Sequence, residues 1–176
     1  MRGAALVGAA LAASVSLTAC ADTLQQEPLR DRDLTSSEAV HYAVYWVGRA
    51  FEGMPLSFAA PQTGGSVAIT YGNCVIGGQS TCVRPLTIVT SHDNSFVPGA
   101  SYSRLRRQIR GRTAVVAMGG TTIEIPTGEV VVDIYAESAA LATAAAQSLE
   151  PLNRPGSPSD PLPPPGPPSG YEQSAS

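Results

Sequence analysis

The chain has 176 residues, of which 14 are acidic and 11 are basic, and every basic residue is an arginine. Its formal net charge of −3 argues against a protein that binds nucleic acid over its surface, since such proteins carry a basic excess. The middle of the chain is long enough to bury one hydrophobic core, and its two ends are polar or proline-rich.

The chain begins with a segment typical of a lipoprotein secretion signal. Arg2 is the only charged residue before position 22, and residues 3–16 are apolar or small but too short to span a bilayer as a helix. They lead into Leu-Thr-Ala-Cys at positions 17–20, a typical cleavage and acylation site. We therefore expect a signal peptide over residues 1–19 and lipidation of Cys20. More than one acyl chain there would anchor the protein stably on the outer face of the cytoplasmic membrane. The alternative is an ordinary signal peptide with Cys20 as a spare thiol.

Residues 20–36 are polar and charged and show no sustained apolar period, which is typical of a flexible tether. The serines and threonine at positions 35–37, with Glu38, could cap a short turn of helix, and a plain linker is the simpler interpretation. A single domain is expected to follow over residues 37–150. Its first element is a strand over residues 40–47, where aromatic and β-branched side chains on both faces favour a strand covered on both sides.

Several motifs resemble those of one family. The run V-Y-W-V-G-R-A-F-E-G-M-P-L at positions 44–56 resembles the Y-W-[LV]-G-x-x-F-x-G-[LM]-P-L signature of an uncharacterised family of actinobacterial envelope lipoproteins. The run Y-G-N-C at positions 71–74, with C-V-R-P-L at 82–86, is similar to the family's Y-G-x-C…C-x-x-P-L element. The family often differs at Val47, Met54 and Pro126. The resemblance covers most of residues 40–150 and implies a fold and an envelope location, but no catalytic residue.

Two alternating segments, residues 66–71 and 84–90, flank a glycine-rich loop and predict a β-hairpin. Cys74 and Cys82 lie near its strand ends and remain as a pair once Cys20 is assigned to lipid. Secretion would expose them to an oxidising compartment, so we expect a disulfide, which stabilises by roughly 2–3 kcal/mol on the entropic model. The alternative is a metal site, for which C-x7-C without a nearby third ligand is poor spacing.

Residues 102–112 carry a cluster of arginines. On a helix, Tyr102, Leu105 and Ile109 would form an apolar stripe, so we expect an amphipathic helix packed on the sheet. A second interpretation is contact with anionic lipid headgroups, at about 1 kcal/mol for each basic residue. The residues that would make this contact are Arg104, Arg106, Arg107 and Arg110.

The rest of the domain predicts three short strands, over residues 113–118, 121–125 and 129–135, and a helix over residues 138–149 with Ser138 as its N-cap. Residues 151–176 hold nine of the fifteen prolines and are expected to form an extended, disordered tail. It would act as a spacer or as the ligand of a proline-binding groove. The fold class is α+β, a mainly antiparallel sheet of about five to seven short strands with one or two helices packed on it.

No catalytic motif is present. Among the acidic residues of the domain, Glu52, Glu124, Glu129 and Asp133 are scattered, so no carboxylate pair stands out. We therefore expect a membrane-anchored, non-catalytic binding or accessory module without cofactor or metal. Its partners would be an envelope protein or anionic lipid, and not nucleic acid. The alternatives are a carrier of an apolar envelope ligand and an accessory cell-wall hydrolase or transferase. An enzyme would need convergent carboxylates, or a histidine, His41 or His92, in a cleft.

Overall fold

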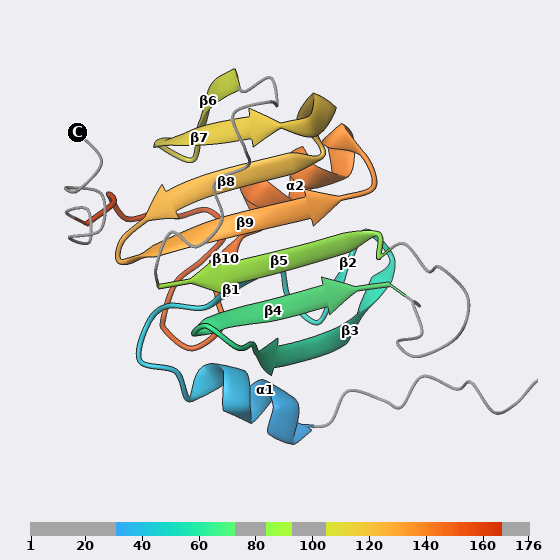
Figure 1. Ribbon diagram of the computed structural model, residues 1–176, viewed down its shortest axis with the longest axis vertical. Coiled ribbons are helices and arrows are strands. Elements are labelled where there is room, and N and C mark those ends of the chain that lie inside the picture. The colour runs from blue at the N-terminus through green and yellow to red at the C-terminus, as the bar shows by residue number, and fades with distance from the viewer. Residues whose placement is uncertain (1–30, 73–83, 93–104, 167–176) are drawn as a thin grey trace, which may run out of the picture.

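The structure of the chain is a computed structural model that describes residues 31–72, 84–92 and 105–166. Within these residues, an antiparallel sheet of eight strands forms the centre of the molecule (Figure 1). In chain order the strands are β2 (Ala50–Phe51), β3 (Met54–Pro61), β4 (Ser66–Tyr71), β5 (Leu86–Ser91), β6 (Leu105–Ile109), β7 (Arg112–Ala117), β8 (Thr122–Thr127) and β9 (Val130–Ala136). Their order across the sheet is β2-β3-β4-β5-β9-β8-β7-β6. The α+β class and the antiparallel sheet are confirmed, and this sheet has more strands than we expected.

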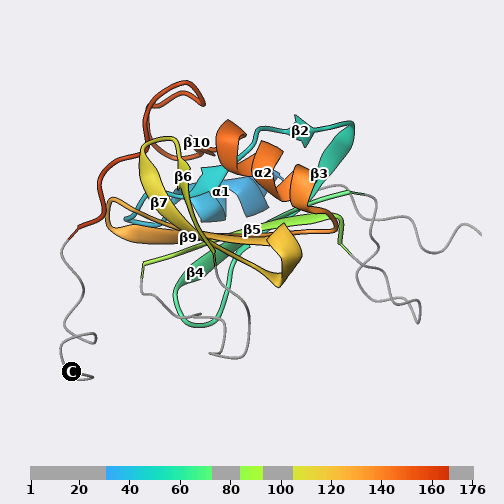
Figure 2. The same cartoon turned by 90° about the horizontal axis from the view of Figure 1, so that it is seen from above.

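One face of the sheet is covered by two helices and a second, two-stranded sheet (Figure 2). These elements are α1 (Asp31–Glu38), α2 (Ala139–Ser148), β1 (Tyr45–Trp46) and β10 (Glu150–Pro151), and a short 3₁₀ turn, Met118–Gly120, joins β7 to β8. α2 packs on β8 and β9, α1 contacts β3, and β1 contacts β5. In the described part of the chain, no helix is both long and apolar enough to cross a membrane.

The core lies between the sheet and this covering layer. Side chains alternate between the two faces of a strand, so partners on neighbouring strands line up in rows. One row runs from β4 to β7 through Ile69, Ile88, Ile134, Ile123 and Val116, all at most 4% exposed. At roughly 1.5–3 kcal/mol for each fully buried aliphatic side chain, the row contributes strongly to the stability of the sheet.

α2 confirms the helix predicted over residues 138–149. The Ser138 hydroxyl accepts a hydrogen bond from the backbone N–H of Leu141 at 3.2 Å, which satisfies one of the unpaired donors at a helix start. Ala142, Ala145 and Ala146 face the sheet and are fully buried. Because these side chains are small, the helix backbone can lie close to β8 and β9.

The helix predicted over residues 102–112 is wrong where the structure describes it. β6 and β7 instead form an antiparallel hairpin in which Ile109 pairs with Arg112. The two turn residues, Arg110 and Gly111, have φ angles of +47° and +78°, as a two-residue type I′ turn requires. The sequence around Leu105 fits a period of 2 as well as 3.6, and pairing with the β-branched residues of β7 selects the strand.

The start of the domain also differs from the prediction. Part of the expected tether forms α1, in which Leu34 and Ser37 are buried against the core. Only Tyr45–Trp46, out of the strand expected over residues 40–47, pairs as a strand, with β10. The rest of this segment is nevertheless held in place, as Tyr42 and Val44 are both buried. The apolar side chains of this segment are therefore explained by burial in the covering layer and not by a place in the main sheet.

The proline-rich tail packs on the domain over residues 151–166, where we expected disorder. Leu162 is 2% exposed and its backbone N–H donates to the Arg110 carbonyl at 3.2 Å. The Thr127 hydroxyl donates to the Pro163 carbonyl at 2.8 Å. Proline lacks an N–H group but keeps its carbonyl acceptor, so donors of the domain can hold this segment without a helix or a ladder.

Candidate functional site

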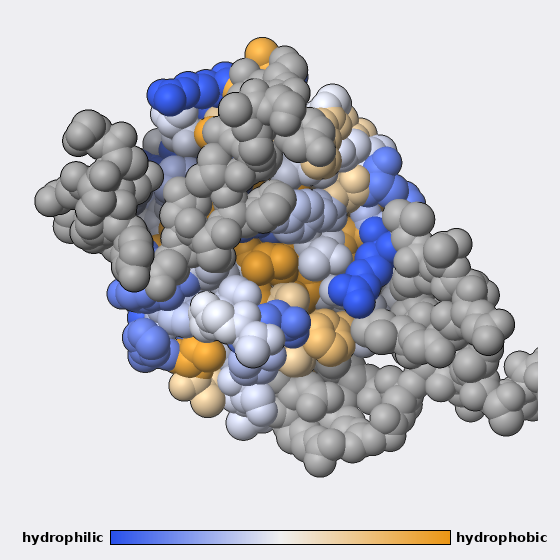
Figure 3. Space-filling model, in the orientation of Figure 1, coloured by the Kyte–Doolittle hydropathy of each residue, from blue (hydrophilic) through white to orange (hydrophobic). Residues whose placement is uncertain are grey.

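The second face of the sheet has a different character, because among the described residues no helix or strand packs on it (Figure 2). Figure 1 looks directly onto this face, with α2 behind the sheet. We call it the open face. In the space-filling view, apolar residues lie near its middle and hydrophilic residues lie toward its edges (Figure 3).

A row of cross-strand partners crosses the open face from β4 to β6. In order across the sheet, its members are Ala68, Val89, Asp133, Glu124, Val115 and Arg106. Each of these residues is next in sequence to a residue of the buried row that runs from Ile69 to Val116, except Arg106, which is next to Leu105, the partner of Val116. The two rows therefore point to opposite faces of the sheet. The row therefore sets two adjacent carboxyl groups between valines.

Glu124 and Asp133 form the candidate site. They face each other directly across β8 and β9, a relation that puts the two Cβ atoms about 4.5–5.5 Å apart. Asp133 is 3% exposed and Glu124 is 9% exposed. Burial raises the pKa of Asp133 to about 7, and the charge of Glu124 contributes to the rise. Because burial and the neighbouring charge both disfavour its ionised form, Asp133 keeps its proton up to about neutral pH.

Two further polar side chains lie on the open face near this pair. Tyr135 is two positions along β9 from Asp133, and burial, followed by the charges of Asp133 and Glu124, raises its pKa to about 12. It therefore keeps its proton and can donate a hydrogen bond. Ser91, opposite Val131, is 3% exposed, and its hydroxyl has no hydrogen-bond partner in the described residues.

Sequence reasoning named Glu124 and Asp133 but did not pair them. The signal was the turn between β8 and β9. Thr127 pairs with Val130 across Gly128 and Glu129, so residues three positions outward on each strand must also be partners. Counting outward from that turn leads to Glu124 and Asp133.

The structure does not gather the predicted arginine cluster on one surface. Arg104 lies outside the described residues, and Arg106 and Arg107 are consecutive on β6 and exposed, so their side chains leave opposite faces of the sheet. Arg110 is engaged in hydrogen bonds: it donates to the carbonyl of Leu149 at the end of α2 and to the tail carbonyls of Ser157 and Asp160. Burial lowers its pKa.

The two histidines of the chain come together at one edge of the molecule. The ring centroids of His41 and His92 are 5.5 Å apart. The Tyr42 ring lies 5.3 Å from that of His41 and 5.8 Å from that of His92. Both histidines are exposed. Neither belongs to the carboxyl pair's row, so the structure gives two separate polar sites.

Cys20, Cys74 and Cys82 lie outside the described residues, so lipidation and the disulfide stay predictions. Across residues 31–72, 84–92 and 105–166, no group of three or more His, Cys, Asp or Glu side chains could hold a metal ion. No protein-family model, curated protein or solved structure matches this chain. The resemblance to actinobacterial envelope lipoproteins therefore stays a prediction.

Proposed function

We propose that this chain is a lipid-anchored, extracytoplasmic binding module whose open face docks a basic side chain of an envelope protein. The acyl chains on Cys20 would hold the domain on the outer face of the cytoplasmic membrane. The observation that carries the proposal is the buried carboxyl pair, Glu124 and Asp133, at the centre of a sheet face on which no described helix or strand packs.

Charge and shape favour a basic occupant. Burying carboxyl groups costs stability unless they are compensated, and perturbed pKa values concentrate at functional sites. Burial raises the pKa of Asp133, and a cation placed beside this carboxyl would favour its ionised form and recover part of the cost of burying it. The valines that flank the pair, Val89 and Val115, offer apolar contact to the aliphatic stem of an arginine or lysine.

Site-specific photo-crosslinking in living cells tests the docking face. A photoreactive amino acid at Val89, opposite Asp133, should give a discrete adduct with a partner protein. The control position is Thr143, which is exposed on α2, on the covered side of the sheet. Adducts formed equally from both positions, or none from Val89 in a folded and membrane-bound protein, would contradict docking at the open face.

One observation favours a second candidate function. A carboxyl with a pKa of about 7 beside a second carboxyl is the arrangement that glycosidases use for acid–base chemistry. On this hypothesis Asp133 donates the proton and Glu124 acts as the ionised partner. Release of soluble fragments from cell-wall glycan by the purified protein, lost in both Glu124→Gln and Asp133→Asn, would favour the hydrolase. Equal release by these variants and the wild type would exclude this role for the pair.

A further inference from the structure

We infer that His41 and His92 together bind a divalent transition-metal ion at the surface of the domain. The chain has only two histidines, and the fold brings them from distant parts of the sequence to a ring-centroid separation of 5.5 Å. A zinc–imidazole bond is about 2.0–2.1 Å long. Two rings bound to one ion at a tetrahedral angle therefore have centroids about 5 Å apart, close to the observed separation.

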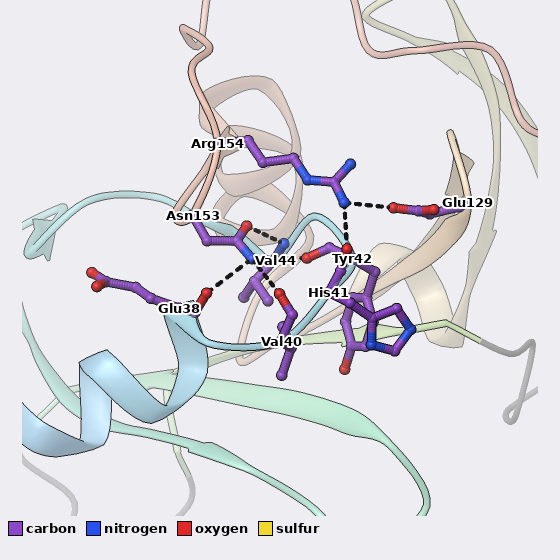
Figure 4. Close-up of polar contacts among 8 residues, drawn as sticks. All are labelled: Glu38, Val40, His41, Tyr42, Val44, Glu129, Asn153 and Arg154. Atoms are coloured by element: carbon purple, nitrogen blue, oxygen red, sulfur yellow. Dashed lines mark hydrogen bonds and ion pairs between the residues drawn. The ribbon is translucent and has the colours of Figure 1, made fainter.

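The backbone that carries His41 is fixed by residues of the tail (Figure 4). The Asn153 side chain donates to the carbonyls of Val40 at 3.2 Å and Tyr42 at 2.8 Å, and it accepts from the Val44 N–H at 3.0 Å. Arg154 donates to the His41 carbonyl itself at 2.6 Å. The backbone on both sides of His41 in the sequence is thus held by hydrogen bonds, which limits where its imidazole ring can lie.

The position of His92 is fixed by the main sheet and by Tyr42. It follows Ser91, the last residue of β5, whose partner on β9 is Val131. Tyr42 packs against both imidazole rings, and its hydroxyl donates to the Gly65 carbonyl at 2.6 Å. Because the two rings are held near each other before any ion arrives, less conformational entropy is lost on binding.

The local charges permit a cation. Arg154 is the basic group nearest the His41 backbone, and its guanidinium lies 2.8 Å from a carboxylate oxygen of Glu129, which offsets its charge. Both imidazoles are exposed, so an ion can reach them from solvent. Tyr42 keeps its proton, because burial raises its pKa, and it therefore serves as a packing neighbour and not as a ligand.

The donor set defines the ligand class. Imidazole suits zinc, copper and nickel, and affinity for a given site rises from nickel to copper and falls again at zinc. Since the described residues offer no set of three His, Cys, Asp or Glu ligands, this pair supplies two positions and leaves the others to water or to a further ligand. We therefore expect an exchangeable site that prefers Cu²⁺ over Zn²⁺.

NMR spectroscopy tests the site directly, because only two imidazoles contribute ring signals. The mature chain, without a histidine tag and with its thiols blocked, is titrated with Zn²⁺ at pH 7.5. The rings of His41 and His92 should shift together and saturate at one ion per chain. Shifts of one ring only, or of the two rings at different zinc concentrations, would overturn the inference.

Two variants complete the test. His92→Gln should weaken zinc binding at the remaining His41 by at least about tenfold, whereas Tyr42→Phe, which keeps the ring, should leave the affinity within about twofold. An unchanged zinc affinity of the His41 ring in His92→Gln would show that the histidines do not act as a pair.

Discussion

The carboxyl group of Asp133 is held in surroundings that oppose its ionisation. Burial raises its pKa to about 7 from an ordinary value of 3.8, and the charge of Glu124 contributes. The folded protein therefore binds this proton more tightly than the unfolded chain does. The resulting stabilisation is fully present below the unfolded pKa and is lost as the pH rises to about 7.

Replacement of Asp133 by asparagine should remove this dependence on pH. Relative to Asp133→Asn, the free energy of unfolding of the wild type should fall by about 2–3 kcal/mol between pH 5 and pH 8. Urea denaturation of both proteins at both pH values measures the difference. Glu129→Gln, which neutralises an exposed carboxylate, is the control and should not reproduce the effect. If the free energy of unfolding of the wild type rises relative to that of Asp133→Asn between pH 5 and pH 8, the carboxyl of Asp133 is not buried in its protonated form.

Cys20 is the residue predicted to carry the lipid anchor. If its sulfur carries the acyl chains, Cys20→Ser should be released from the membrane or accumulate with the signal peptide uncleaved. Fractionation of cells and mass spectrometry of the N-terminal peptide measure both outcomes. Ala21→Ser keeps the cysteine and is the matched control. Full retention of processed Cys20→Ser in the membrane fraction would refute the anchor.

At the scale of elements, the turn between β6 and β7 connects the sheet to the tail. Arg110 has a φ angle of +47°, and its guanidinium donates to the carbonyl of Leu149 at the end of α2 and to two tail carbonyls, those of Ser157 and Asp160. These bonds give backbone carbonyls outside the main sheet a donor from the β6–β7 turn. The tail, in turn, supplies Asn153 and Arg154, which fix the segment carrying His41 (Figure 4).

Arg110→Asn separates the turn from the contacts, because asparagine tolerates a positive φ but cannot reach the tail carbonyls. We expect a loss of stability of about 2–4 kcal/mol, since hydrogen bonds to a charged group contribute about 1.5–3 kcal/mol each and act here as a group. Limited proteolysis should then cut within residues 151–166 first. Arg107→Asn, on exposed β6, should change stability by no more than about 0.5 kcal/mol. Equal behaviour of the two variants would mean that Arg110 does not hold the tail.

The elements that the sequence predicted well are those whose local pattern agrees with their tertiary role. Ser66–Tyr71 and Val130–Ala136 alternate clearly and are strands, and Ala139–Ser148 combines a good N-cap with helix-forming alanines. The segment around Leu105 was missed because its apolar positions fit two periods, and only pairing with β7 decides between them. The ordered part of the tail was missed because a high proline content indicates few backbone N–H donors. The carbonyl groups of the tail can nevertheless accept hydrogen bonds, and they accept them from Thr127 and Gly128.

The candidate site could be predicted only in part for the same reason. The turn at Gly128 fixes that Glu124 faces Asp133, so that pair was accessible from local sequence. The meeting of His41 with His92 was not, because it depends on how the segment before β1 crosses over β5. Asn153 and Arg154 hydrogen-bond the backbone of that segment, and both come from a part of the chain with no local signal for structure.

At the scale of the whole molecule, the described helices and the two-stranded sheet pack on one face of the main sheet only. If the chain is anchored to a membrane as we propose, the two faces of the sheet would not be equivalent toward it. Arg106 belongs to the row of the open face and Arg107 pairs with Ala114 on the covered side. A flat anionic surface can touch one of these two arginines more closely than the other. The contact with lipid headgroups predicted from the sequence therefore depends on which face of β6 is turned toward the membrane.

Liposome binding by the mature chain carrying Cys20→Ser, which lacks the anchor, tests this orientation. Arg106→Gln or Arg107→Gln, but not both, should weaken binding to anionic liposomes by about fivefold, since one basic residue near such a surface contributes about 1 kcal/mol. The effect should fade at high salt. Equal weakening by the two substitutions, or no dependence on lipid charge, would contradict contact through one face of β6.

Recognition of a basic group of a partner protein by the carboxyl pair on the open face is the function that we propose for this chain. The most direct test is the yield of the adduct from a photoreactive residue at Val89, compared between the wild type and the doubly neutralised Glu124→Gln/Asp133→Asn variant. We expect the yield to fall by at least about tenfold, because removal of a buried charge partner typically costs 2–5 kcal/mol, while membrane levels stay equal. An adduct of undiminished yield in the neutral variant would contradict the claim.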